Sequence, residues 1–170
     1  MPHTLTARDG ASTGGQTRVV IVEDHHAIRA ALVMLLDSCP DITVVGEAPS
    51  VGQACAVIAA QDPHLVLLDL RLGGQDGLDV ARRLRASGSR TPVLVLSASD
   101  GALDLREALD AGADGFLSKS VPSRVLLDGV RRAAAGETVI GEELAFALRA
   151  RAADPAPSAP RRLLGAARVL

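Results

Sequence analysis

Apolar residues recur along the chain in two alternating patterns between residues 18 and 135. Short apolar runs bounded by turn residues are typical of strands that are buried on both faces of a parallel sheet. Between these runs, apolar residues three and four positions apart are typical of helices that bury one face. The expected strands lie at residues 19–22, 42–45, 65–68, 93–96 and 115–117, and the expected helices at residues 28–36, 51–58, 76–84, 102–111 and 122–133.

Five strands that alternate with five helices predict a doubly wound α/β fold. Parallel neighbours require crossover connections, and these are right-handed, so helices cover both faces of the sheet. The length of the region favours a flavodoxin-like sheet over a six-stranded dinucleotide-binding fold. We therefore expect a flavodoxin-like parallel sheet of five strands in the order 2-1-3-4-5, although periodicity alone does not establish strand order.

Composition and charge narrow the class of protein. The 170 residues are 48% hydrophobic, which is ample for one core, and the net charge of −2 creates no field for nucleic acid or an anionic membrane. Cys39 and Cys55 form no CxxC motif and are expected to be reduced thiols. No apolar segment approaches the ~18–20 residues of a membrane span, and the first residues lack the apolar run of a signal peptide. We expect a cytoplasmic protein without membrane association.

Both ends of the chain differ from this region in composition. Residues 1–17 are polar, rich in glycine and threonine and without period, so we expect a disordered tail. Residues 152–170 are rich in proline, alanine and arginine and are expected to form a second tail.

Polar residues directly follow four of the five expected strands. They are Glu23 and Asp24 after the first, Asp69 after the third, Ser97 after the fourth and Lys119 after the fifth. Taken alone, Asp69 is more often a cap of the following turn or helix. The carboxyl ends of parallel strands meet at one edge of a sheet, however, and ligands bind there. We therefore interpret the five residues as one site.

Three neighbouring carboxylates repel one another and raise one another's pKa unless a cation lies among them. Oxygen ligands suit Mg²⁺ better than zinc, for which the chain offers no clustered cysteine and histidine set. Lys119 is the single lysine among 18 basic residues, which indicates a need for a compact ammonium charge. His25 and His26 follow the acidic pair, but we do not favour them as metal ligands because adjacent side chains of a helix do not share a face.

Residues 18–135 resemble the receiver domain of bacterial two-component response regulators. The resemblance rests on the motifs Val-Glu23-Asp24, Leu-Asp69-Leu-Arg-Leu-Gly-Gly-Gln-Asp-Gly, Leu-Ser97-Ala and Gly-Phe116-Leu-Ser-Lys119.

The resemblance implies that Asp69 accepts a phosphoryl group from a phosphohistidine of a sensor histidine kinase. It also implies that Asp24, Asp69 and the backbone carbonyl of Arg71 ligate Mg²⁺, and that Glu23 acts mainly through a metal-bound water. Positioning and charge neutralisation carry most of phosphoryl transfer, so a metal ion and Lys119 beside the phosphate oxygens suit this chemistry.

The resemblance further implies a switch. Ser97 would hydrogen-bond the phosphate oxygens, and Ala98 would leave space for them. Phe116 would turn inward and change the surface of the fourth helix, fifth strand and fifth helix, although burial alone also accounts for an aromatic residue there. We expect a shift between two forms that changes protein association, including a phosphorylation-dependent homodimer.

Two positions depart from the pattern of the family. Gly73 replaces the usual proline, so we expect a looser loop after Asp69. Glu23 stands where aspartate is frequent, which is expected to shift the metal slightly. Neither departure removes a required group.

Residues 121–148 resemble the last receiver helix and the following linker helix of the LuxR/NarL-type subfamily. We accordingly expect a receiver domain at residues 18–135 and a linker helix at residues 136–151. That subfamily continues into a helix-turn-helix, but the residues after 151 are too few for one. We expect no specific DNA binding by this chain.

The sequence therefore predicts a phosphoacceptor switch rather than an enzyme. The alternative within the same family is a LuxR/NarL-type transcriptional regulator shortened by truncation or frameshift. A phosphohydrolase with an aspartate nucleophile is a rival, but its DxD pattern would place a carboxylate where Arg71 stands. A degenerate interaction module is a second rival, but it is expected to have lost Asp69, Asp24 or Lys119. No GxGxxG or GxxxxGK[ST] motif indicates a nucleotide site.

Overall fold

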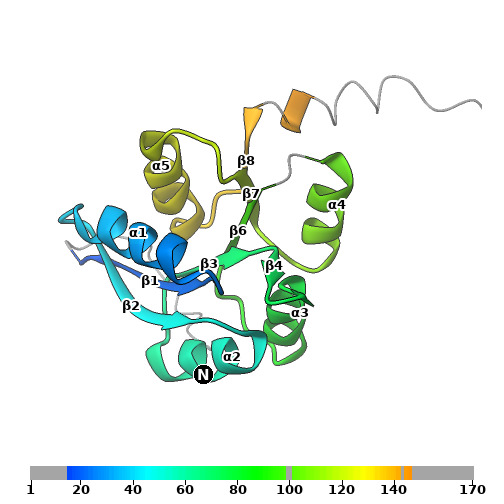
Figure 1. Cartoon of the computed structure of the whole chain (residues 1–170), viewed down its shortest axis with the longest axis horizontal. Coiled ribbons are helices and arrows are strands. Elements are labelled where there is room, and N and C mark those ends of the chain that lie inside the picture. The colour runs from blue at the N-terminus through cyan, green and yellow to red at the C-terminus, as the bar shows by residue number, and fades with distance from the viewer. Residues whose placement is uncertain (1–14, 99–100, 143, 147–170) are drawn as a thin grey trace, which may run out of the picture.

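The computed structural model describes residues 15–98, 101–142 and 144–146, and its centre is a parallel sheet of six strands. The strands are hydrogen-bonded in the order β2-β1-β3-β6-β7-β8 (Figure 1). The first five follow the expected 2-1-3-4-5 order, so the flavodoxin-like prediction is confirmed, and β8 is an addition to it. The strands of this sheet are β1 (Thr17–Val22), β2 (Ile42–Ala48), β3 (Leu65–Asp69), β6 (Val93–Ser97), β7 (Gly115–Ser118) and β8 (Val139–Ile140).

Helices cover both faces of this sheet (Figure 1). The helices are α1 (His26–Asp37), α2 (Val51–Gln61), α3 (Leu78–Ala86), α4 (Ala102–Asp110) and α5 (Ser123–Ala134). Successive residues of a strand point to opposite faces, so Val19 and Ile21 share a core with α1 and α5. Val20 and Val22 share the other core with α2, α3 and α4. Each fully buried aliphatic side chain contributes about 1.5–3 kcal/mol to folding.

The residues at the two ends of α2 show how local sequence determines where a helix begins and ends. Ser50 precedes the helix, and its side chain accepts a hydrogen bond from the backbone N–H of Gln53 at 3.4 Å. Asp62 ends the helix in the left-handed region, with φ of 43°, and its N–H donates to the carbonyl of Ile58. Short polar side chains are preferred at both kinds of position. Pro63 then leads the chain into β3.

The expected linker helix at residues 136–151 is wrong at its start. Gly136 leaves α5 with φ of 87°, and Val139–Ile140 form β8 instead of helix. The N–H of Gly141 donates to the carbonyl of Phe116 at 3.2 Å. Two β-branched residues favour a strand, and β8 pairs the edge of β7 that would otherwise expose its backbone groups. Glu142 and residues 144–146 are helical, and the rest of the expected helix lies outside the described residues.

The N-terminal tail is expected to reach residue 17, but β1 already starts at Thr17. The N–H of Thr17 donates to the carbonyl of Asp41 at 2.7 Å, so this residue belongs to the sheet. Residues 1–14 of the expected tail, and the expected tail at residues 152–170, lie outside the described residues. Within the part of the chain that the structure describes, no helix has the length and apolar character to cross a membrane.

Candidate functional site

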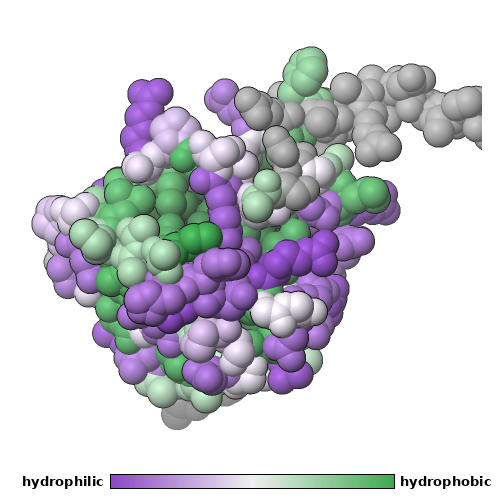
Figure 2. All heavy atoms as spheres, in the orientation of Figure 1, coloured by the Kyte–Doolittle hydropathy of each residue, from purple (hydrophilic) through white to green (hydrophobic). Residues whose placement is uncertain are grey.

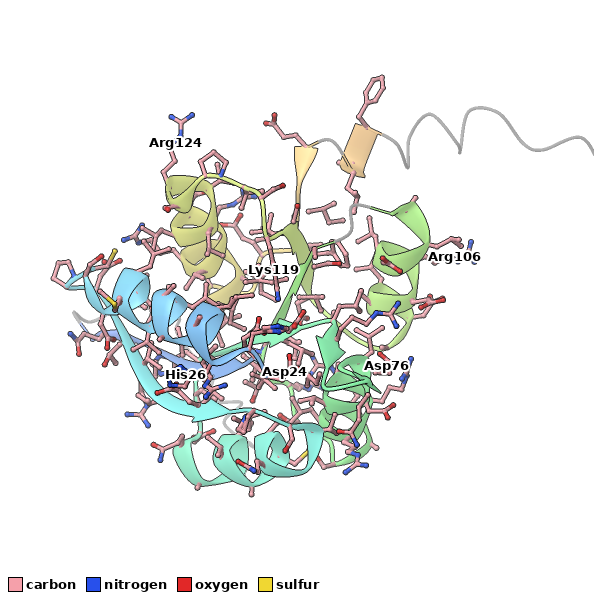
Figure 3. The ribbon with its side chains drawn as sticks, viewed as in Figure 1. Asp24, His26, Asp76, Arg106, Lys119 and Arg124 are labelled. Carbon is pink, nitrogen blue, oxygen red and sulfur yellow. The ribbon has the colours of Figure 1, made fainter. Side chains whose placement is uncertain are left out.

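The carboxyl ends of β1, β3, β6 and β7 form the sheet edge that carries the predicted site. Glu23 and Asp24 directly follow β1, Asp69 is the last residue of β3, and Lys119 directly follows β7. Figure 3 shows Lys119 pointing toward the part of this edge where Asp24 lies. Hydrophilic residues gather across the middle of the same face (Figure 2). The parallel sheet thus brings together groups that are far apart in the sequence.

Lys119 joins two of the carboxylates directly. Its Nζ lies 2.6 Å from Oε2 of Glu23 and 3.0 Å from Oδ2 of Asp69. Glu23 is 1% exposed and Asp69 is 7% exposed, so both carboxylates are withdrawn from solvent. Burial opposes the charge of Lys119, but the hydrogen bonds to Glu23 and Asp69 outweigh burial and raise the pKa of its ammonium group. Lys119 therefore carries its charge throughout the physiological pH range.

Backbone groups hold the acidic pair that follows β1. The N–H of His25 donates to Oε1 of Glu23 at 3.0 Å, which leaves Oε2 facing Lys119. The N–H of Gly73 donates to Oδ2 of Asp24 at 2.9 Å. The Asp24 side chain is 26% exposed, so this carboxylate lies at the entrance of the site.

A short antiparallel hairpin follows Asp69. Its two strands are β4 (Arg71–Leu72) and β5 (Gln75–Asp76), each of two residues. Gly73 and Gly74 occupy its turn with φ of 55° and 83°, values that glycine adopts without strain. The expectation of a looser loop than in relatives with proline stays a prediction. Proline could neither adopt the positive φ of Gly73 nor donate an N–H to Asp24, so this turn depends on the glycine at position 73.

The same loop approaches Asp69 from two sides. The N–H of Arg71 donates to Oδ1 of Asp69 at 3.3 Å. A Cβ atom at Gly77 would overlap the backbone carbonyl oxygen of Asp69, so only glycine permits this close approach. The hairpin therefore returns against the end of β3 and holds the aspartate in place.

The remaining residues of the predicted site lie at the carboxyl end of β6 and within β7. Ser97 is the last residue of β6 and is buried, and Ala98 is exposed directly after it. The carbonyl of Ser97 accepts a hydrogen bond from the N–H of Lys119 at 2.7 Å, which ties the two strand ends together. Phe116 is 1% exposed and packs in the core with Leu105 of α4. It therefore occupies an inward position, and its role as a switch stays a prediction.

Oxygen atoms dominate the potential metal ligands at this edge. Among the described residues, a group of ligand atoms from Glu23, Asp24 and His25 lies within 4.8 Å of one another. Nδ1 of His25 is 3.7 Å from Oδ1 of Asp24 and 3.9 Å from Oε1 of Glu23, so this residue lies closer to the acids than the sequence indicated. A set rich in carboxylate oxygens fits a hard cation such as Mg²⁺ better than zinc.

Sequence reasoning missed two residues that contact the acidic pair. Arg29 donates to the backbone carbonyl of Glu23 at 2.7 Å, and Gly73 donates to Asp24. Glycine in place of the usual proline was visible in the sequence, but the acceptor 49 residues away was not. The contact of Arg29 with Glu23 depends on the direction of α1 relative to β1, and no sequence pattern indicates that direction.

Comparisons with known proteins agree with this geometry. Residues 19–131 match the family model of the response regulator receiver domain. The nitrate/nitrite response regulator NarL of Escherichia coli is 38% identical over 132 residues, which cover 78% of this chain and 61% of NarL. The DNA-binding transcriptional activator DevR/DosR of Mycobacterium tuberculosis is 33% identical over 134 residues, covering 79% of this chain and 62% of DevR/DosR. The chain therefore spans about three fifths of the length of these curated relatives.

Solved structures show the same similarity. The signal receiver domain of a NarL response regulator from Mycobacterium tuberculosis has a TM-score of 0.69 at 36% identity, and the match covers 72% of this chain and 99% of that one. A two-component response regulator of the LuxR family from Aurantimonas has a TM-score of 0.78 at 25% identity, and the match covers 82% of this chain and 100% of that one.

Proposed function

The chain belongs to the family of response regulator receiver domains, and we propose that Asp69 is the residue on which it accepts a phosphoryl group. The observation that carries this proposal is the contact of Lys119 with both Asp69 and Glu23, at 3.0 Å and 2.6 Å. A carboxylate that is paired with an ammonium group at the carboxyl end of a parallel strand is positioned to receive a charged group from solvent. Receiver domains are phosphoacceptor signalling domains rather than classical enzymes.

The donor in this proposal is a phosphohistidine of a sensor histidine kinase. An oxygen of Asp69 forms a bond to phosphorus while the bond between phosphorus and the histidine nitrogen breaks. The N–H of Arg71 at 3.3 Å and Nζ of Lys119 at 3.0 Å hold the two oxygens of Asp69 before transfer. After transfer, Lys119 is placed to contact the oxygens of the new phosphate, and Ser97 and Ala98 lie at the neighbouring strand end.

The acidic residues of the site give Mg²⁺ a place in this proposal. Asp24, Asp69 and the backbone carbonyl of Arg71 would hold the ion, and Glu23 would act through a water. When bound, the ion supplies positive charge against the carboxylates and the incoming phosphoryl group. The chain's own contribution is to orient Asp24 with the N–H of Gly73 and Glu23 with the N–H of His25.

Removal of divalent cations is expected to stop phosphoryl transfer, because Lys119 alone does not balance three carboxylates and an incoming dianion. Intact-mass spectrometry of the protein with acetyl phosphate measures this directly. Labelling should appear with Mg²⁺, disappear with a chelator and return when Mg²⁺ is added in excess. Equal labelling in the presence of the chelator would show that transfer does not use a metal ion.

We also propose a cytoplasmic location, where a sensor kinase meets its receiver. Cys39 and Cys55 are free thiols in the structure, which agrees with a reducing compartment. The DNA binding named for DevR/DosR is a property of that protein. The absence of specific DNA binding by this chain stays a prediction.

Occupation of Asp69 by a phosphoryl mimic is expected to change association of the protein. The hydrogen bond between Lys119 and Ser97 couples the site to β6 and β7, and Phe116 of β7 packs against α4. Bonds of a few kcal/mol to the mimic are sufficient to invert the populations of two forms. Light scattering and pull-down of a sensor kinase, with and without beryllofluoride and Mg²⁺, measure the change. If Asp69 is occupied and both the molar mass of the assembly and its affinity for the kinase are unchanged, phosphorylation does not control association of this protein.

A further inference from the structure

We propose that Arg29 is a positioning residue that fixes the metal-binding geometry of the acidic pair through the backbone. The inference rests on the proposed function, because it concerns the carboxylates that would hold Mg²⁺. Arg29 lies in the first turn of α1, the helix that follows the acidic pair. Its side chain is 14% exposed. As a positioning residue, Arg29 contacts neither Asp69 nor the phosphoryl group and acts through Glu23 and Asp24.

The guanidinium group of Arg29 contacts the backbone carbonyls of the acidic pair. Its Nη1 donates to the carbonyl oxygen of Glu23 at 2.7 Å and lies 3.5 Å from the carbonyl oxygen of Asp24. Its Nε donates to Oε2 of Glu47 in β2 at 3.1 Å. One planar group therefore joins the end of β1 to the neighbouring strand, a geometry that lysine does not reproduce.

These contacts determine where the carboxylate of Glu23 points. The carbonyl of Asp24, which lies 3.5 Å from Nη1, and the N–H of His25 belong to the same peptide group, and that N–H donates to Oε1 of Glu23 at 3.0 Å. The carbonyl of Glu23, held at 2.7 Å, belongs to the peptide group directly before it. Because a peptide group is planar, a group that holds its carbonyl also sets the direction of its N–H. With a short bond to the earlier of these peptide groups and a longer contact to the later one, Arg29 restrains the backbone that presents the His25 N–H to Oε1, and Oε2 is left for Lys119.

Two physical effects of Arg29 on cation binding have opposite signs. Its positive charge beside the acidic pair repels a divalent cation, so the charge alone would weaken binding. Its hydrogen bonds orient the ligands, and removal of such supporting contacts typically weakens metal binding about 10–100-fold. Glu47 offsets part of the charge of Arg29, which leaves orientation as the larger effect. The sign of the change in affinity therefore separates the two effects.

We expect Arg29→Ala and Arg29→Lys each to weaken binding of Mn²⁺, used as a probe of the Mg²⁺ site, about 10–100-fold. Electron paramagnetic resonance of free Mn²⁺, and calorimetry with Mg²⁺, measure binding without any phosphoryl donor. Arg106→Ala is the matched control, because Arg106 is an exposed helical arginine whose partner is Asp110 at 3.8 Å. Circular dichroism at the working temperature confirms that each variant is folded, and Arg29→Gln, which also removes the charge, replaces Arg29→Ala if that variant is not.

The outcomes separate this inference from the proposed function. Tighter Mn²⁺ binding by Arg29→Ala, with unchanged binding by Arg29→Lys, would show that Arg29 acts by charge alone and would overturn the inference. Weaker binding by both variants supports it, even if wild-type protein takes no phosphoryl group at Asp69 and the proposed function fails. Labelling of the wild type at Asp69, together with Mn²⁺ affinities equal to that of Arg106→Ala, would retain the proposed function and reject the role of Arg29.

Discussion

Asp69→Asn is expected to abolish phosphoryl incorporation from acetyl phosphate in the presence of Mg²⁺. Asparagine has nearly the same shape as aspartate, and its side-chain oxygen still accepts the N–H of Arg71, which lies 3.3 Å from Oδ1 of Asp69. The amide has no negative oxygen to attack phosphorus, so the change removes the nucleophile while it keeps the fold. Intact-mass spectrometry should show one added phosphoryl group on the wild type and none on the variant.

Asp76→Asn is the matched control for this experiment. Asp76 is an exposed residue of β5 in the same loop, and its carboxylate pairs with Arg82 at 2.8 Å and accepts the N–H of Leu78 at 3.0 Å, a bond that asparagine can also accept. Its labelling should equal that of the wild type. Undiminished labelling of Asp69→Asn would assign the phosphoryl group to another side chain and would reject Asp69 as the acceptor.

The sequence was sufficient to predict the sheet and the edge that carries the site. The five buried strands have uninterrupted apolar runs, and the polar residues that follow them need only the parallel direction to meet. Glu23, Asp69 and Lys119 are 46 to 96 positions apart, yet each is the first charged group after an apolar run. Their convergence follows from topology, which the alternation of patterns predicts.

Features that depend on short segments or on tertiary contacts were not predictable in this way. β8 contains only Val139–Ile140, too few residues for a period to be recognised, and it forms because the edge of β7 is available. The Gly73 turn could be recognised as glycine-rich, but its hydrogen bond to Asp24 requires the structure. Arg29 looks like an ordinary polar residue of an amphipathic helix until its contact with the carbonyl of Glu23 is seen.

Lys119→Met is expected to lower the free energy of unfolding by about 3 kcal/mol at neutral pH. The variant keeps a side chain of similar length but leaves Glu23, 1% exposed, and Asp69, 7% exposed, without the ammonium group that contacts both. Removal of one partner from a buried ion pair costs more than the pair itself contributes, because the remaining charge is desolvated and uncompensated. Urea denaturation followed by far-ultraviolet circular dichroism measures the change, since the chain has no tryptophan or tyrosine for fluorescence.

The pH dependence of the unfolding free energy provides a second test of this prediction. The pKa of Lys119 is raised in the folded protein, because its hydrogen bonds to Glu23 and Asp69 outweigh its burial. The stabilisation is therefore complete below the ordinary lysine pKa of about 10.4 and is lost as the pH rises through the folded value. The difference between wild type and Lys119→Met should be constant from about pH 7 to pH 9 and should shrink at higher pH.

Arg124→Met separates the effect of the buried ammonium group from that of net charge. Arg124 is an exposed cation of α5, so its removal changes the net charge equally but leaves no buried carboxylate unpaired. Surface charges of this kind contribute little to stability, and this variant should unfold within about 0.5 kcal/mol of the wild type. If Lys119→Met unfolded at the same urea concentration as Arg124→Met, the two carboxylates would not depend on Lys119 for their compensation.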